Sequence, residues 1–133
     1  ALPISDLTAI ENVALPLLMQ GVDKKEAYSR AKEMLERMGL GHRLENVPAH
    51  LSGGEQQRVS ITRAITHNPK ILFADEPTAN LDNESSRKVM EVFKELNANG
   101  QTIVMVTHEE EYARLAHRII NLADGKIIKD TNL

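Results

Sequence analysis

Residues 51–58 read Leu-Ser-Gly-Gly-Glu-Gln-Gln-Arg, and residues 71–76 read Ile-Leu-Phe-Ala-Asp-Glu. The first segment opens a helical pattern, because Ser52 can cap a helix while Gly53 and Gly54 add no side-chain bulk beside its free N–H groups. The second segment is an apolar strand that ends in two carboxylates. Anions bind at helix N-termini, and ligands of open α/β folds bind at the carboxyl ends of strands. This stretch therefore predicts an α/β fold with a phosphate-binding turn and a pair of acids.

The part of the chain before this stretch is predicted to be helical. Capping side chains at residues 6–8 precede apolar residues at helical spacing, which end at Gln20-Gly21. Asp23 begins a second amphipathic helix that ends at Gly39. Residues 41–50 are polar and rich in turn formers, so we expect a loop there.

The part of the chain after this stretch is predicted to alternate between strands and helices. Residues 70–74 and 102–106 are expected to form strands, and a helix capped by Asp82 lies between them. Because residues 102–106 are apolar throughout, we expect that strand to be covered on both faces, as in a parallel sheet. A short helix is expected over residues 109–117, and the Asp-Gly pair at 124–125 predicts a C-terminal β-hairpin.

Together these elements predict a single domain, residues 1–133, in two parts. A helical subdomain is expected over residues 6–68, and it includes a helix that runs from Gly53 to about His67. Residues 69–133 are expected to form an incomplete, mostly parallel sheet with flanking helices. A chain of 133 residues is long enough for one modest core and too short for two.

Composition excludes several classes of function. A net charge of -3 and 3% aromatic residues argue against nucleic-acid binding, which depends on basic patches and stacking platforms. The absence of cysteine excludes disulfides and thiolate metal sites, and it suits a reducing cytoplasm. No apolar run in the sequence reaches the roughly 20 residues that span a bilayer, so a membrane role is expected to come through a partner.

Each short motif, taken alone, also has a structural explanation. Residues 52–55, Ser-Gly-Gly-Glu, fit a capping box in which Ser and Glu satisfy each other's backbone donors. Asp75 and Glu76 could lie in a solvated turn after a strand. A lone His108 after a strand is more often structural than catalytic.

The longer segments resemble those of the ATP-binding-cassette (ABC) ATPases. Residues 51–64, Leu-Ser-Gly-Gly-Glu-Gln-Gln-Arg-Val-Ser-Ile-Thr-Arg-Ala, resemble the family's signature segment, with Glu55 where Gln is commonest. Residues 71–77 resemble the Walker B segment, and residues 77–82 resemble the D-loop. Residues 107–109, Thr-His-Glu, resemble the switch segment that follows a strand. The resemblance implies a partial P-loop NTPase domain of the ABC ATPase type.

For the signature segment, the resemblance implies contacts to a nucleotide held mainly by another subunit. Ser52, Gly53 and Gly54 would contact the γ-phosphate of that ATP, and Glu55 belongs to the same ATP-binding turn. Asp82 of the D-loop would help to align two subunits across the nucleotide. The implied partner is therefore a second ABC ATPase subunit in a head-to-tail, ATP-dependent dimer.

For the acids and the switch segment, the resemblance implies catalysis. Asp75 would reach Mg²⁺, Glu76 would orient or deprotonate the attacking water, and His108 would contact the γ-phosphate and that water. The other four histidines, among them His42, match no motif and are expected to be surface or packing residues. No structural metal is predicted.

The resemblance covers residues 7–130 and corresponds to the later half or so of a complete nucleotide-binding domain. The pattern G-x-x-x-x-G-K-[ST], which wraps the β- and γ-phosphates, does not occur in the sequence. We expect a C-terminal fragment that is inactive alone, whose sheet lacks strands and leaves apolar surface exposed. Residues 1–5 look like the translation of a sequencing adapter and are expected not to be native.

Two further segments are similar to the lipoprotein-release and macrolide-export branch of bacterial transporters. They are residues 7–13, Leu-Thr-Ala-Ile-Glu-Asn-Val, and residues 122–127, Leu-Ala-Asp-Gly-Lys-Ile. This resemblance implies an integral membrane permease as a partner, contacted through residues 9–38. It also implies a cytoplasmic location at the inner face of the membrane.

Two alternative functions remain open. The first is a non-transport ATPase of the same family, although such enzymes carry long heptad arms and residues 23–38 span only about four to five turns. The second is a non-catalytic interaction module that keeps the fold.

Overall fold

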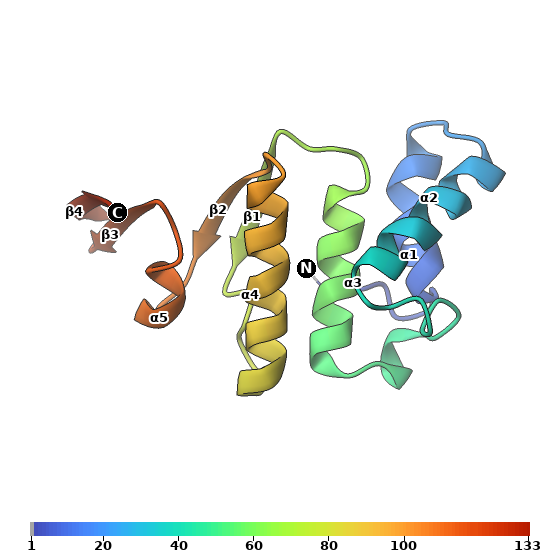
Figure 1. Ribbon diagram of the computed structural model, residues 1–133, viewed down its shortest axis with the longest axis horizontal. Helices are drawn as coiled ribbons and strands as arrows, with labels where there is room; N and C mark the ends of the chain where they lie inside the picture. The colour runs from blue at the N-terminus through green and yellow to red at the C-terminus, as the bar shows by residue number, and fades with distance from the viewer. Residues whose placement is uncertain (1) are drawn as a thin grey trace.

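The computed structural model describes residues 2–133; Ala1, and with it part of the expectation about residues 1–5, lies outside the described residues. The elements in chain order are α1 (Ala9–Met19), α2 (Lys24–Arg37), the 3₁₀ helix η1 (Pro48–His50), α3 (Gly53–Ile65), β1 (Ile71–Asp75), α4 (Asn83–Ala98), β2 (Thr102–Val106), α5 (Glu110–Ala113), β3 (Arg118–Ala123) and β4 (Lys126–Asn132). Figure 1 shows α1 and α2 at one end, α3 and α4 side by side in the middle, and the β3–β4 hairpin at the other end. Among the described helices, none combines the length and apolar character needed to cross a bilayer.

The helices begin at the predicted capping residues. Thr8 caps α1 in a capping box with Glu11, Asp23 caps α2 by accepting from the Lys25 N–H, and Asp82 caps α4. Each cap satisfies backbone donors that have no partner inside the helix and stabilises the helix by about 1 kcal/mol. These helix starts are therefore confirmed.

The first hydrophobic core lies between α1, α2 and α3. Its buried residues are Ala9, Ile10, Val13, Ala14, Leu17, Ala27, Ala31, Leu35, Leu40, Leu51 and Val59. Beside this core, the buried Asn12 donates to the carbonyl of Leu7 and accepts from the Arg63 guanidinium at 3.0 Å. The start of the chain is thus tied to α3, on which the predicted phosphate-binding turn lies.

The second core lies between α3, α4 and one face of a two-stranded parallel sheet. Its buried residues are Ile61, Ile65, Leu72, Val89, Met90, Val92, Phe93 and Tyr112. In the sheet, Ile71 pairs with Thr102 and Asp75 with Val106, so both strands end at the same edge. That edge is where the predicted acids lie.

The other face of the sheet is open, and one expectation about it was wrong. We expected β2 to be covered on both faces, but Val104 and Val106 of β2 are 43% and 58% exposed, and Phe73 of β1 is 73% exposed. Within residues 2–133, only the face towards α4 is covered. The expectation that apolar surface would be left exposed is confirmed.

Three further segments can be compared with their predictions. Residues 48–50 form a 3₁₀ turn instead of a plain loop, with Pro48 in its first turn. The helix expected over residues 109–117 is only four residues long, because the Leu115 and Ala116 N–H groups bond three residues back in tighter turns. The hairpin is confirmed, with Asp124 and Gly125 at positive φ in its turn.

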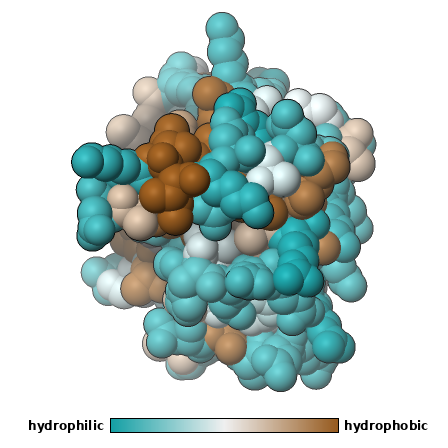
Figure 2. Space-filling model, turned by 90° about the vertical axis from the view of Figure 1, so that its left-hand side faces the viewer, coloured by the Kyte–Doolittle hydropathy of each residue, from teal (hydrophilic) through white to brown (hydrophobic). Residues whose placement is uncertain are grey.

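The hairpin end of the molecule carries exposed apolar side chains. Leu122, Ile127 and Ile128 are 69%, 64% and 67% exposed. Figure 2 views the molecule from this end and shows brown hydrophobic patches among hydrophilic side chains. Together with the open sheet face, these side chains leave much of the apolar surface of this half of the chain in contact with solvent.

Candidate functional site

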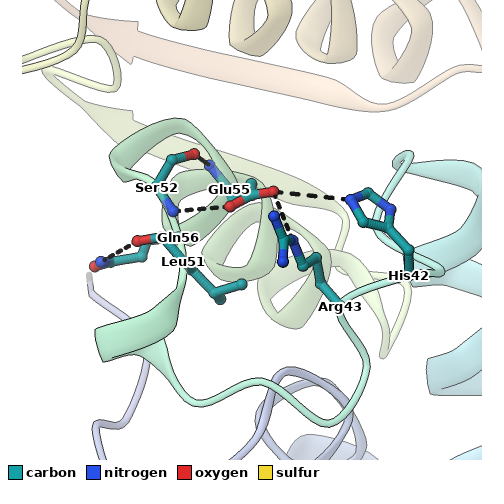
Figure 3. Close-up of polar contacts among 6 residues, drawn as sticks. All are labelled: His42, Arg43, Leu51, Ser52, Glu55 and Gln56. Atoms are coloured by element: carbon teal, nitrogen blue, oxygen red, sulfur yellow. Dashed lines mark hydrogen bonds and ion pairs between the residues drawn. The ribbon is translucent and has the colours of Figure 1, made fainter.

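The N-terminus of α3 is formed by the predicted Ser-Gly-Gly turn. Ser52 caps the helix: its hydroxyl accepts from the Glu55 N–H at 3.2 Å, and the Glu55 carboxylate accepts from the Ser52 N–H at 2.8 Å (Figure 3). Gly53 and Gly54 are the first two residues of the helix. Because the first N–H groups of a helix have no intrahelical acceptor, those of the two glycines are suited to an anion.

The turn before Ser52 is held by a side chain of the helix itself. The Gln56 side-chain amide donates to the carbonyl of Pro48 at 3.0 Å and to that of Leu51 at 3.2 Å, and Figure 3 shows the second bond. Since Pro48 belongs to η1, these two bonds join the 3₁₀ turn to the start of α3. The residues that precede the Ser-Gly-Gly turn are therefore held in place by a side chain that follows the turn.

The carboxylate of Glu55 has a second set of contacts. Its Oε1 accepts from Nε of Arg43 at 3.1 Å, and Nε2 of His42 lies 4.0 Å away (Figure 3). Burial would raise the pKa of Glu55, but the Ser52 N–H and the Arg43 guanidinium lower it below its ordinary value. Neither Arg43 nor His42 was predicted to lie at this site.

The glycine at position 54 is required by a close approach between two helices. A Cβ atom on Gly54 would lie 2.9 Å from Cβ and Oγ of Ser85, in the first turn of α4. Ser85 in turn donates from its N–H and its hydroxyl to Asp82, at 2.9 and 2.7 Å, and these bonds lower the pKa of Asp82. The starts of α3 and α4 therefore lie side by side, at the lower edge of the molecule in Figure 1, and place Asp82 near the Ser-Gly-Gly turn.

At the carboxyl edge of the sheet, the structure brings together two predicted catalytic residues. Asp75 is the exposed last residue of β1, and Glu76 follows at a φ of 44° while its N–H donates to the Val106 carbonyl at 2.8 Å. The carboxylate of Glu76 lies 2.9 Å from Nδ1 of His108, and this hydrogen bond and the negative charge raise the pKa of His108. A positive φ at a non-glycine residue costs about 1 kcal/mol or more and is found preferentially at functional sites.

A second bond joins the same two loops. The hydroxyl of Thr78, which is 3% exposed, donates to Oε1 of Glu109 at 2.9 Å. The Glu109 N–H donates to Oγ1 of Thr107 at 3.1 Å, so the residues on both sides of His108 are held. No short-range pattern points to Thr78 and Glu109 as partners, since they lie far apart in the sequence.

The arrangement at the sheet edge suits a water molecule and a cation bound with a nucleotide. Oε2 of Glu76 is buried and has no hydrogen-bond partner among residues 2–133, so its capacity to accept a hydrogen bond is not used within these residues. The described residues contain no cluster of three or more His, Asp or Glu side chains that would form an all-protein metal site. Mg²⁺ commonly uses one or two carboxylates together with phosphate and water ligands, a role that Asp75 fits.

The chain is similar to known proteins in sequence and in fold. Residues 3–79 match the family model described as ABC transporter. The chain is 54% identical over 97% of its length to an uncharacterized ABC transporter ATP-binding protein, MJ1508, of Methanocaldococcus jannaschii. It is 51% identical over 94% of its length to the lipoprotein-releasing system ATP-binding protein LolD of Aquifex aeolicus, and 50% identical over 96% to the macrolide export ATP-binding/permease protein MacB of Aggregatibacter actinomycetemcomitans.

A solved structure shows the same fold. The dimeric, post-hydrolysis ATP-binding cassette MJ0796, bound to ADP and Pi, matches 98% of this chain with a TM-score of 0.84 and 41% identity. The predicted fold class is thereby confirmed. The chain spans 58% of that cassette, 58% of MJ1508, 56% of LolD and 20% of the MacB protein.

The contact between Glu76 and His108 can be tested by titration. Replacing Glu76 with Gln removes the negative charge that stabilises the imidazolium, so the pKa of His108 should fall towards its ordinary value. The measurement is NMR detection of the His108 ring through a pH titration of residues 1–133. The exposed Glu110→Gln variant, which also removes one carboxylate near the loop, is the control and should leave this pKa nearly unchanged. An unaltered His108 pKa in Glu76→Gln would show that the pair does not form.

The contact between α3 and α4 can be tested with glycine variants. Gly54→Ala should lower the free energy of unfolding by about 1 kcal/mol or more, because overpacking against Ser85 outweighs the gain from replacing glycine. In Gly53→Ala the new Cβ meets only the flexible tip of Leu81, at 3.1 Å, and little loss is expected. Urea denaturation measures both. A Ser85→Gly background should reduce the Gly54→Ala effect; equal losses in both backgrounds would contradict the contact.

Proposed function

Because this chain belongs to the ABC transporter family of ATP-binding proteins, we propose that residues 2–133 supply two separate parts of the ATP-hydrolysing sites of a complete cassette. The first part is the Ser-Gly-Gly turn with Asp82, and the second is the sheet edge with Glu76 and His108. The lysine and the hydroxyl of a phosphate-binding loop would come from outside these residues, and without them residues 1–133 would be inactive. We divide the domain into a helical subdomain, residues 6–68, and an α/β part, residues 69–133.

The observation that carries this proposal is the pair formed by Glu76 and His108. One oxygen of Glu76 contacts His108, and the other is buried without a protein partner among the described residues. That second oxygen can accept a proton or a hydrogen bond from the attacking water, while the imidazole remains close to the transferred phosphoryl group. Asp75, one residue earlier, would hold Mg²⁺, which neutralises charge on the phosphates when bound. This division of tasks fits adjacent residues at the end of one strand.

The Ser-Gly-Gly turn would act on a second nucleotide, bound mainly by another subunit. Ser52, Gly53 and Gly54 offer a hydroxyl and helix N–H groups to a γ-phosphate, and Glu55 completes the turn as its capping partner. Asp82 would align the two subunits, a role supported by its place beside Ser85 and the start of α3. The similar cassette MJ0796 is dimeric, which supports the pairing of two subunits, and we propose that the two are arranged head to tail.

Transport is the most specific part of the proposal. The names of LolD and MacB describe lipoprotein release and macrolide export, and MacB combines an ATP-binding part with a permease. We infer that the cassette works with an integral membrane permease, contacts it through residues 9–38, and acts at the cytoplasmic face of the membrane. The helix α2, with 14 residues, is too short to be the heptad arm of a chromosome-maintenance ATPase. The alternative function is a non-catalytic module with this fold. The next experiment distinguishes it from an ATPase.

The catalytic role of Glu76 can be tested in a complete cassette that contains these residues. Glu76→Gln should keep ATP-dependent dimerisation, because the turn around Ser52 is unchanged, while the hydrolysis rate falls by about two orders of magnitude or more, as expected for the loss of a general base. Size-exclusion chromatography with ATP and a phosphate-release assay measure the two properties. Glu84→Gln, which neutralises an exposed carboxylate in the first turn of α4, serves as the matched control. Unchanged hydrolysis in Glu76→Gln would remove Glu76 from this role, and an inactive wild-type cassette would favour the non-catalytic module.

A further inference from the structure

The capping box at the start of α3 uses only half of the Glu55 carboxylate. Oε2 accepts from the Ser52 N–H at 2.8 Å, whereas Oε1 faces the guanidinium of Arg43 at 3.1 Å (Figure 3). The side chain of Glu55 is 14% exposed and that of Arg43 is 38% exposed. A capping box alone needs no arginine. Helix capping therefore does not explain the contact between Glu55 and Arg43.

Arg43 is held in place by the loop that carries it. The Arg43 N–H donates to the Leu40 carbonyl, and its own carbonyl accepts from the Asn46 N–H. The same loop is bound to the start of α1, where the N–H groups of Ala9 and Ile10 donate to loop carbonyls at 2.9 and 3.0 Å. The guanidinium of Arg43 is therefore presented to Glu55 from a backbone that hydrogen bonds hold in place.

If Arg43 were absent, the negative charge on the Glu55 carboxylate would be unfavourable for two reasons. A partly buried carboxylate that loses its charged partner keeps its desolvation cost. An unpaired negative charge three residues from Ser52 would also repel a phosphate at the helix N-terminus, whereas a paired one would repel it less. A glutamine at position 55 would need neither form of compensation.

We propose that Arg43 is a positioning residue for the ATP-contacting turn: its guanidinium orients and neutralises the Glu55 carboxylate, which in turn holds the backbone of Ser52. The proposal rests on the proposed function, because it assumes that Ser52, Gly53 and Gly54 meet a nucleotide phosphate. It explains why a glutamate is accepted at a position where a neutral side chain would also cap the helix. His42, at 4.0 Å, adds to the positive side of this cluster when it is protonated.

A double-mutant cycle in a complete cassette tests the proposal. The proteins are the wild type, Arg43→Met, Glu55→Gln and the double variant, and ATP hydrolysis is measured over a range of ATP concentrations. Arg43→Met alone should lower kcat/KM about tenfold, because the partly buried carboxylate of Glu55 becomes unpaired. In the Glu55→Gln background no carboxylate is left unpaired, so the double variant should have nearly the same kcat/KM as Glu55→Gln, whatever Glu55→Gln does by itself. The proposal would be overturned if Arg43→Met lowered kcat/KM equally in the wild-type and Glu55→Gln backgrounds, or if it lowered kcat/KM in neither.

Matched controls separate positioning from general loss of stability. Arg114→Met removes an exposed arginine that pairs with Glu110 at the end of α5 and should leave kcat/KM within about twofold. Arg43→Lys keeps the positive charge without the planar fork, so it should recover part of the lost activity. It replaces Arg43→Met in the cycle if the latter does not yield folded protein.

A second readout does not depend on ATP hydrolysis. In NMR spectra of residues 1–133, Arg43→Met should shift the Ser52 amide signal and raise the pKa of Glu55, and the amide shift should largely disappear in the Glu55→Gln background. An unshifted Ser52 amide would overturn the proposal whatever the activity. If the wild-type cassette does not hydrolyse ATP but this coupling is observed, the proposed function fails while the contact itself stands.

Discussion

The close approach of two helix starts organises the candidate site. The first turn of α3 meets the first turn of α4 at Gly54 and Ser85, where even one added methyl group would lie 2.9 Å from the neighbouring side chain. This contact brings the Ser-Gly-Gly turn at the start of α3 against the segment that follows the sheet edge. The site thus depends on packing between α3 and α4 as much as on the motifs themselves.

The sheet edge adds a second constraint, which is imposed by the parallel register. Because Asp75 pairs with Val106, the residues after β1 and β2 leave the sheet side by side, and Glu76 can reach His108. The positive φ of Glu76 turns the chain at this point, and Thr78 fixes the next part of the loop to Glu109. Two loops from distant parts of the sequence therefore meet and bring two catalytic candidates into contact.

Features that depend on neighbouring residues could be predicted from the sequence. The caps at Thr8, Asp23 and Ser52 and the hairpin turn involve side chains and backbone groups within a few positions of one another. The pairing of Glu76 with His108 followed from a family resemblance rather than from spacing.

Features that depend on packing could not be predicted. Arg43 and Glu55 lie 12 residues apart, and Thr78 and Glu109 lie 31 apart, so each pair meets only because helices and strands have packed. The prediction for β2 failed for a related reason. An apolar strand is suited to burial on both faces, but its composition does not say whether other segments within residues 2–133 cover both.

The central claim is that Ser52 and Glu76 of one chain serve different nucleotides. The most direct test mixes two complete cassettes, one with Ser52→Arg and one with Glu76→Gln, each inactive by itself. In a head-to-tail dimer of the two, the intact Ser52 of one subunit faces the intact Glu76 of the other, so ATP hydrolysis should reappear on mixing. A mixture as inactive as its components would contradict the claim and would place both residues at the same nucleotide.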